Sequence, residues 1–166
     1  MIELRDFTGS DFDTLKSWIN SEEELIQFAG SIFMFPLTDE QLQNYINIPD
    51  IKPFKVVLSA TNETIGHCEL NYENGNNRLS RILIGNKDAR GKGICKQIVL
   101  KMIEMLLEDS AVNEVDLYVF DWNKRALKCY ENIGFEINPQ KTKKLEVNGK
   151  TWNSLNMTLK RKNRLQ

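Results

Sequence analysis

Cysteine and histidine are scarce in this chain. Cys68, Cys95 and Cys129 are the three cysteines, and His67 is the single histidine, among 166 residues. The cysteines are odd in number and widely spaced, so they form neither a disulfide framework nor a CxxC metal or redox motif. One histidine gives little support to a zinc enzyme or a His-based triad, and no GxSxG motif occurs. We therefore expect reduced thiols, a cytoplasmic location and no metal.

Long apolar runs and an excess of one charge are also missing. Nowhere do eighteen apolar residues follow one another, and Glu3 and Asp6 stand where a leader peptide has apolar residues. The formal net charge of −1 gives no general attraction for nucleic acid or anionic lipid. We expect neither a membrane nor a nucleic-acid partner, and we assign the basic residues at 161–166 to a C-terminal tail.

Length and composition fit one globular domain. Hydrophobic residues make up 41% and charged residues 27% of the chain, close to ordinary globular values. A chain of 166 residues can bury a core without disulfides or metal. No repeat, low-complexity tract or linker divides it, so residues 1–160 are expected to form a single domain. The sequence leaves open whether the protein is a monomer or a homodimer.

Periodic patterns predict a mixed sheet with flanking helices. A strand, a long helix, a strand and a second helix follow one another between residues 79 and 133, which implies a right-handed parallel crossover. Asn148-Gly149 predicts a terminal hairpin. The fold class is thus α/β, a mostly antiparallel sheet with one parallel βαβ unit. Strand patterns cover 2–5, 54–58, 64–72, 79–84, 115–120, 143–147 and 151–159; long helical patterns cover 92–107 and 123–133, and shorter ones follow Ser10, Ser21 and Thr38.

An apolar segment at 28–36 lies between two helical patterns and ends in proline. It either packs on the core as a loop or forms the aromatic lip of a substrate pocket, and the sequence favours neither.

The segment Arg90-Gly91-Lys92-Gly93 predicts an anion site where the long helix begins. Amides in the first turn of a helix have no intrahelical partner, and the positive end of the helix dipole points outward. The two glycines leave room for a phosphate, and the flanking Arg90 and Lys92 add positive charge. A P-loop does not fit because Gly93 follows Lys92, and a dinucleotide fingerprint fails because Lys96 occupies its last glycine position.

The same segment resembles the GNAT acetyltransferase motif of Arg or Gln, two residues, Gly, one residue, then Gly or Ala. Arg90 and Gly93 are in place, and Cys95 stands at the final small position. The resemblance covers nearly the whole chain, although it is looser at the two ends. Within the family, the chain looks like the branch that contains ribosomal-protein, polyamine and aminoglycoside acetyltransferases. A second GNAT pattern, Asn-x-x-Ala-x-x-x-Tyr-x-x-x-Gly-Phe, is matched by Asn123, Ala126, Tyr130, Gly134 and Phe135.

This resemblance implies a GNAT fold and an enzyme that transfers acetyl from acetyl-CoA to a primary amine by direct attack in a ternary complex. The strand before the phosphate loop would splay from its parallel neighbour and pair with the pantetheine arm, and an amide near Leu83 would stabilise the thioester oxygen. Nothing in this scheme needs a metal. The cofactor-binding residues that it implies are Ile82, Leu83, Ile84, Arg90, Gly91, Lys92, Gly93, Ile94, Cys95 and Asn123.

The resemblance also assigns Tyr130 as the proton donor to the leaving CoA thiolate. A phenol has a pKa of about 10 and a thiol of about 8.5, so the help is geometric more than thermodynamic. Tyr130 also lies on an apolar stripe, so a core tyrosine is the alternative. Asn123 either contacts the CoA arm or caps the following helix.

An acceptor amine with a pKa of about 10.4 is mostly protonated at neutral pH and needs a base. Glu69 is the candidate, and strand alternation puts His67, the reserve candidate, on the same face. A solvated carboxylate at Glu69 with a water chain as base is an equal alternative.

The acceptor itself, a small molecule or a peptide amine, is left open by the sequence. The acidic residues near the two short helices either attract a polycation or are ordinary first-turn acids. A non-catalytic CoA or acyl-CoA sensor on the same fold is the alternative function. These acidic residues are Glu22, Glu23, Glu24, Asp39 and Glu40.

Overall fold

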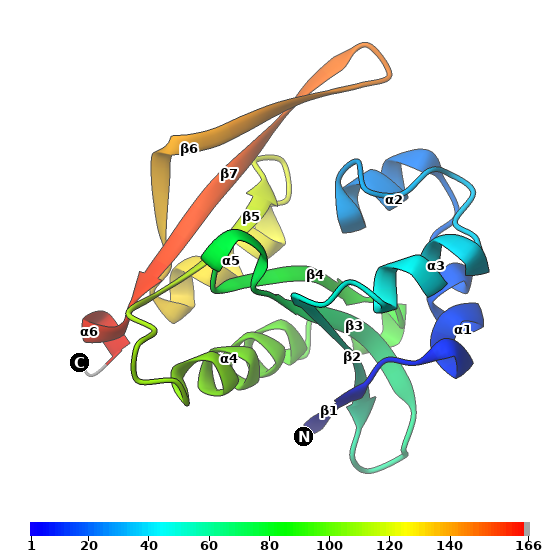
Figure 1. Cartoon of the computed structure of the whole chain (residues 1–166), viewed down its shortest axis with the longest axis horizontal. Helices are drawn as coiled ribbons and strands as arrows, with labels where there is room; N and C mark the ends of the chain where they lie inside the picture. The colour runs from blue at the N-terminus through cyan, green and yellow to red at the C-terminus, as the bar shows by residue number, and fades with distance from the viewer. Residues whose placement is uncertain (165–166) are drawn as a thin grey trace.

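The computed structural model describes residues 1–164 and has one seven-stranded mixed sheet in the order β1-β2-β3-β4-β5-β7-β6 (Figure 1). The predicted fold class is confirmed. The strands are β1 (Ile2–Asp6), β2 (Ile51–Leu58), β3 (Thr64–Asn71), β4 (Arg78–Ile84), β5 (Glu114–Phe120), β6 (Glu136–Val147) and β7 (Lys150–Lys160). The helices are α1 (Phe12–Ser17), α2 (Glu22–Ala29), α3 (Asp39–Ile46), α4 (Ile94–Leu107), α5 (Lys124–Ile133) and α6 (Arg161–Arg164).

Helices cover both faces of this sheet and make two separate cores. On one face α4 buries its predicted apolar stripe, in which Ile98, Met102 and Ile103 are 0% exposed. On the other face α1, α2 and α3 bury Leu15, Leu25 and Leu42. In Figure 1 these three short helices gather on one side, away from α4. Residues from β4 take part in both cores, so this strand is held from both faces.

The parallel pairing of β4 with β5 is very short. It consists of Arg78 opposite Asp116 and Leu79 opposite Leu117. Just beyond, the β3–β4 register shifts, and Arg81 has a positive φ of 47°. Across this shift β4 has one more residue than β3, which makes a β-bulge. A bulge bends its strand and increases the twist. The rest of β4 therefore pairs with β3 alone, and the predicted splay between β4 and β5 is present.

The terminal hairpin reaches across the molecule to α2. Its turn residues Asn148 and Gly149 have φ values of 50° and 78°, as the Asn-Gly pair predicts. The Asn148 side chain donates to Glu23 of α2 at 3.3 Å. β6 begins at Glu136, earlier than predicted. The prediction missed this start because the first residues of the strand are mostly exposed and show no apolar alternation.

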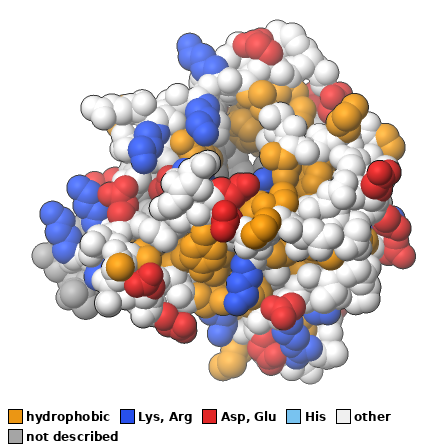
Figure 2. Space-filling view, viewed as in Figure 1, with side chains coloured by type: hydrophobic (Ala, Val, Ile, Leu, Met, Phe, Trp, Pro, Cys, Tyr) orange, Lys and Arg blue, Asp and Glu red, His pale blue; other side chains and the backbone are white. Residues whose placement is uncertain are grey.

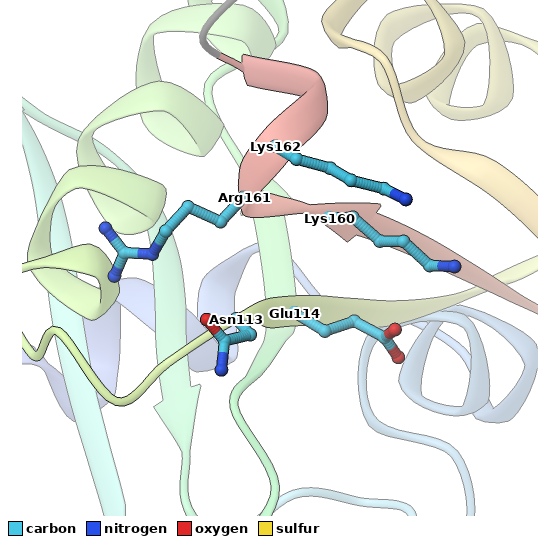
Figure 3. A pocket seen from close by; sticks show the side chains of 5 residues that line it. All are labelled: Asn113, Glu114, Lys160, Arg161 and Lys162. Carbon is cyan, nitrogen blue, oxygen red and sulfur yellow. The ribbon is translucent and has the colours of Figure 1, made fainter.

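The start of the predicted basic tail has a structural role. The Arg161 guanidinium donates to the carbonyl oxygens of Leu107, Asp109 and Val112 at 2.8–3.2 Å and thereby caps the end of α4. Figure 3 shows Arg161 pointing opposite to Lys160 and Lys162, beside a shallow cavity of about 400 Å³. Residues 165 and 166 lie outside the described residues. Within residues 1–164, no helix is both long and apolar enough to cross a membrane.

The approach of β3 to β4 at Gly66 gives a first prediction. A Cβ atom on Gly66 would lie 2.4 Å from the carbonyl oxygen of Leu83, which cannot move without disturbing the strand ladder. Gly66→Ala should lower the free energy of unfolding by about 1–3 kcal/mol in urea titrations. Gly9→Ala is the control, because its new Cβ would meet nothing within 4 Å. Equal stability of the two variants would contradict this close packing.

Candidate functional site

The loop from β4 to α4 has the geometry of an anion site. Gly91 and Gly93 have φ values of 75° and 74°, and Gly93 is the residue that precedes the helix. A Cβ atom at either glycine would meet nothing within 4 Å, so the space above the first helical amides is open. The helix starts at Ile94, slightly later than predicted, and its first-turn amides lack helical partners. This loop can therefore accept a phosphate group.

Two contacts fix this loop at its strand end. The Arg90 side chain donates from Nε to the carbonyl oxygen of Ile84 at 2.9 Å, which leaves its other guanidinium nitrogens for an anion. The indole of Trp18 packs so closely on Gly85 that a Cβ there would fall 1.8 Å from the ring. No local sequence signal predicts this second contact, because Trp18 and Gly85 are far apart in the sequence.

The hydrogen bonds across β3 and β4 decide which strand amides face the splay. Gly85 donates its amide to Ile65 of β3 at 2.9 Å. Because amides alternate in direction along a strand, the amide of Leu83, which pairs with His67, also points to β3. The amide of Ile84 points to the gap. This direction disfavours the predicted role of Leu83 as oxyanion donor, because its amide faces β3; the assignment itself stays a prediction.

A cavity of about 450 Å³ lies where β4 and β5 separate. Its walls come from the end of α2 and the loop after it, from β4, β5 and β6, and from the start of α5. Ile82, Asn123 and Tyr130 line it, whereas Leu83, Ile84 and the phosphate loop do not. Figure 2 shows a hollow between the terminal hairpin and α2, with lysine or arginine side chains on the hairpin side.

Tyr130 is a core residue that also lines the cavity, and Asn123 is a helix cap that also borders it; their roles toward the cofactor stay predictions. Tyr130 is 6% exposed and packs edge-on against Phe135, yet it lines the cavity. Burial raises the pKa of Tyr130, and its hydroxyl has no hydrogen-bond partner within residues 1–164. The Asn123 side chain caps α5 by accepting from the Ala126 amide at 3.4 Å, and it also borders the cavity.

Glu69 is buried behind the cavity wall. It is 0% exposed, and it accepts hydrogen bonds from Tyr45 at 2.5 Å, Arg81 at 2.5 Å and Asn71 at 3.3 Å. Burial raises the pKa of Glu69, while Arg81 opposes that shift. The alternative of a solvated sheet-face carboxylate is therefore wrong, and Glu69 itself does not line the cavity.

His67 is also enclosed, so it is poorly placed as a reserve base. Its Nδ1 lies 2.9 Å from the Arg81 carbonyl oxygen, and the rings of Phe7 and Phe28 pack edge-on against it. Burial lowers the pKa of His67 to about 4, so the imidazole is neutral near pH 7. It does not line the cavity. Sequence analysis missed both Tyr45 and Arg81, which complete this buried group.

The apolar segment at 28–36 has both of its predicted characters. Phe33 is buried in the core, Ser31 and Ile32 line the cavity, and Phe28 is both buried and part of the cavity wall. Gln41 holds the segment, because its side chain accepts from the Met34 amide at 2.7 Å and donates to carbonyls of the same loop.

The two remaining cysteines meet beside this site. The thiol of Cys95, in the first turn of α4, forms a hydrogen bond with Cys129 of α5, and this contact and burial raise the pKa of Cys95. Cys95 therefore faces α5 at its motif position, while Ile94 beside it is buried in the core. No cluster of three or more possible metal ligands occurs in the described part of the chain.

Comparison with known sequences agrees with this geometry. The family model "Acetyltransferase (GNAT) domain" matches residues 2–136. An aminoglycoside N(6')-acetyltransferase type 1 of Klebsiella pneumoniae is 25% identical over 150 residues, covering 81% of this chain and 74% of the relative. A thialysine N-epsilon-acetyltransferase of Bos taurus is 32% identical over 87 residues, which cover 47% of this chain and 51% of the relative.

Solved structures share the fold. A spermidine N-acetyltransferase from Vibrio cholerae in complex with CoA and spermine has a TM-score of 0.79 at 17% identity, covering 99% of this chain and 98% of its own. An aminoglycoside acetyltransferase in complex with coenzyme A has a TM-score of 0.71 at 21% identity, covering 98% of this chain and 96% of its own. With its phosphate loop, its splayed strands and the family match over most of its length, the chain belongs to the GNAT acetyltransferases, which take their acetyl group from acetyl-CoA.

Proposed function

We propose that this chain transfers the acetyl group of acetyl-CoA directly to a primary amine held in the cavity between β4 and β5. The main support for this proposal is that the β4–β5 pairing ends after Leu79. Beyond that point, strand amides face a cavity that Tyr130 also lines. The phosphate loop follows the same strand. Along the chain, the free edge of β4 thus connects the phosphate loop to Ile82, which lines the cavity with Tyr130. This arrangement of an anion site, a strand edge and a proton donor supports an enzyme over a CoA sensor.

The proposed cofactor site follows from this path. The amides at Gly93, Ile94 and Cys95 would hold the diphosphate, together with the charges of Arg90 and Lys92. The free edge of β4 at Ile84 would pair with the pantetheine arm as an added strand does. Bound acetyl-CoA supplies an activated thioester at the inner end of the cavity.

The amide of Ile82 takes over the oxyanion role first assigned to Leu83. Of the three strand residues 82–84, Ile82 is the one that lines the cavity with Tyr130. A fixed amide there stabilises negative charge on the thioester oxygen during attack. The Tyr130 phenol is protonated at neutral pH and can give its proton to the departing thiolate. Because burial raises the pKa of Tyr130, this help depends on the position of the hydroxyl and not on its acidity.

The proton of the acceptor amine leaves toward two carboxylates, Glu73 in the cavity wall and the buried Glu69 behind it. Asn71 donates to Glu69 at 3.3 Å and to Glu73 at 3.1 Å, and so joins the two side chains. Only Glu73 of this pair lines the cavity. We therefore assign base action, direct or through water, to Glu73, and we assign Glu69 to positioning Arg81.

Small amines are the proposed acceptors. The compared enzymes are, by name, N-acetyltransferases of an aminoglycoside, of thialysine and of spermidine. A cavity of about 450 Å³ suits an acceptor of that size.

Reduced thiols support the proposed cytoplasmic location, since Cys68, Cys95 and Cys129 are all free.

Gly93→Val tests the cofactor site. A branched side chain at Gly93 would crowd the phosphate position, so the Kd for CoA in calorimetry should rise at least tenfold. Gly149→Val is the matched control: its φ of 78° imposes similar backbone strain in the distant hairpin turn. Unchanged CoA affinity in Gly93→Val would count against the site.

Tyr130→Phe tests the proton donor. Acetyl-CoA affinity should stay within about twofold, and kcat in a thiol-release assay should fall at least tenfold. Tyr72→Phe, an exposed tyrosine outside the cavity, should retain wild-type turnover. Equal turnover in wild type and Tyr130→Phe would remove Tyr130 from the mechanism.

Glu73→Gln tests the base. Loss of the carboxylate at the wall should lower kcat/KM for the amine at least tenfold, with partial recovery at high pH where the amine loses its proton unaided. The exposed Glu40→Gln should behave as wild type. If instead Glu69→Gln, folded and able to bind CoA, showed that pH-dependent loss while Glu73→Gln did not, the original assignment of Glu69 would stand.

A further inference from the structure

The charged residues that line the cavity are mostly basic. Arg78, Arg81, Lys143 and Lys144 stand against a single carboxylate, Glu73. A site for a polycation would need the opposite balance. The ligand that the cavity suits therefore depends on which of these charges the protein itself neutralises.

Both arginines have protein partners. Arg78 makes a two-point ion pair with Asp116, with N–O distances of 3.0 and 2.9 Å. Arg81 pairs with Glu69. The Nε of Arg81, however, is buried and has no hydrogen-bond partner among the described residues, on a side chain only 10% exposed. This atom is enclosed by protein, so neither arginine offers its charge freely to a ligand.

The lysines are not neutralised. Neither Lys143 nor Lys144 takes part in an ion pair within residues 1–164. The ammonium of Lys143 lies 4.4 Å from the centre of the Tyr118 ring, whose other close cation is Arg78 at 4.8 Å. This cation–π contact holds Lys143 at the cavity wall without cancelling its charge.

The acidic residues first considered as attractors of a polycation do not line the cavity. Glu24 accepts from the Asn20 amide at 2.6 Å at the start of α2, and Asp39 pairs with Lys16 at 2.5 Å. Glu23 accepts from the hairpin residue Asn148. They act as first-turn helix acids and surface contacts, so the interpretation as a polycation attractor loses its support.

We infer that the acceptor is a primary amine that also carries a carboxylate, with the carboxylate bound by Lys143 on β6. This inference rests on the proposed acetyltransferase function and narrows its substrate class. A zwitterionic amine matches the charges that line the cavity: the Glu73 carboxylate for the ammonium end, and the unpaired Lys143 ammonium for the anionic end. A polyamine would bring only positive charge to these lysines.

Pairs of amines that differ only by a carboxylate test the inference. L-lysine against cadaverine and L-ornithine against putrescine serve as probes, with initial rates measured at saturating acetyl-CoA. In the wild type, kcat/KM for the amino acid should exceed that for its diamine at least tenfold. Lys143→Gln, or the double variant with Lys144→Gln, should remove at least tenfold of that ratio while the KM for acetyl-CoA stays unchanged. Lys141→Gln, an exposed lysine on β6 outside the cavity, should keep the ratio.

Three results would overturn the inference alone: diamines preferred or equal in the wild type, both members of a pair slowed equally by Lys143→Gln, or a raised KM for acetyl-CoA. The last would assign the lysines to the cofactor. If the protein binds acetyl-CoA yet acetylates neither these probes nor any other amine, the proposed function fails, and the inference falls with it.

Discussion

The early end of the β4–β5 pairing is the constraint on which the rest of the site depends. Two residue pairs hold the parallel strands together, and then β4 turns away while it stays paired to β3. A strand with one free edge in the middle of a sheet is normally a liability, because its amides and carbonyls lack partners. Here that edge borders a cavity and leads directly into the phosphate loop, so the unpaired backbone becomes a binding surface.

The buried polar group around Arg81 keeps β4 in this shape. Arg81 has a positive φ, which costs energy for a residue with a side chain. His67 contacts its carbonyl oxygen, and Glu69 binds its guanidinium. Tyr45 of α3 completes the group by donating a hydrogen bond to Glu69. An ion pair this deeply buried is weak support for stability in itself, since desolvation offsets much of the attraction. Its value lies in fixing one backbone geometry at the point where the two strands separate.

Local signals predicted the phosphate loop, the α4 stripe and the terminal turn, because each depends on residues close together in sequence. The buried group was not predictable: Tyr45 and Glu69 are 24 residues apart, and nothing local marks their contact. Strand alternation placed His67 and Glu69 on one face but could not tell that α3 covers it. Similarly, the direction of the Leu83 amide depends on how β4 pairs with β3. The exposed start of β6 carries no periodicity to detect.

Amide hydrogen exchange at β4, followed by NMR with and without CoA, shows whether this strand has a free edge that the cofactor covers. The Ile84 amide should exchange fast in the free protein and at least tenfold more slowly with CoA, because the pantetheine arm then pairs with that edge. The Leu83 amide should be slow in both states, since it belongs to the β3–β4 ladder. If the Ile84 amide exchanged slowly in the free protein and CoA left its rate unchanged, β4 would have no free edge there for the cofactor.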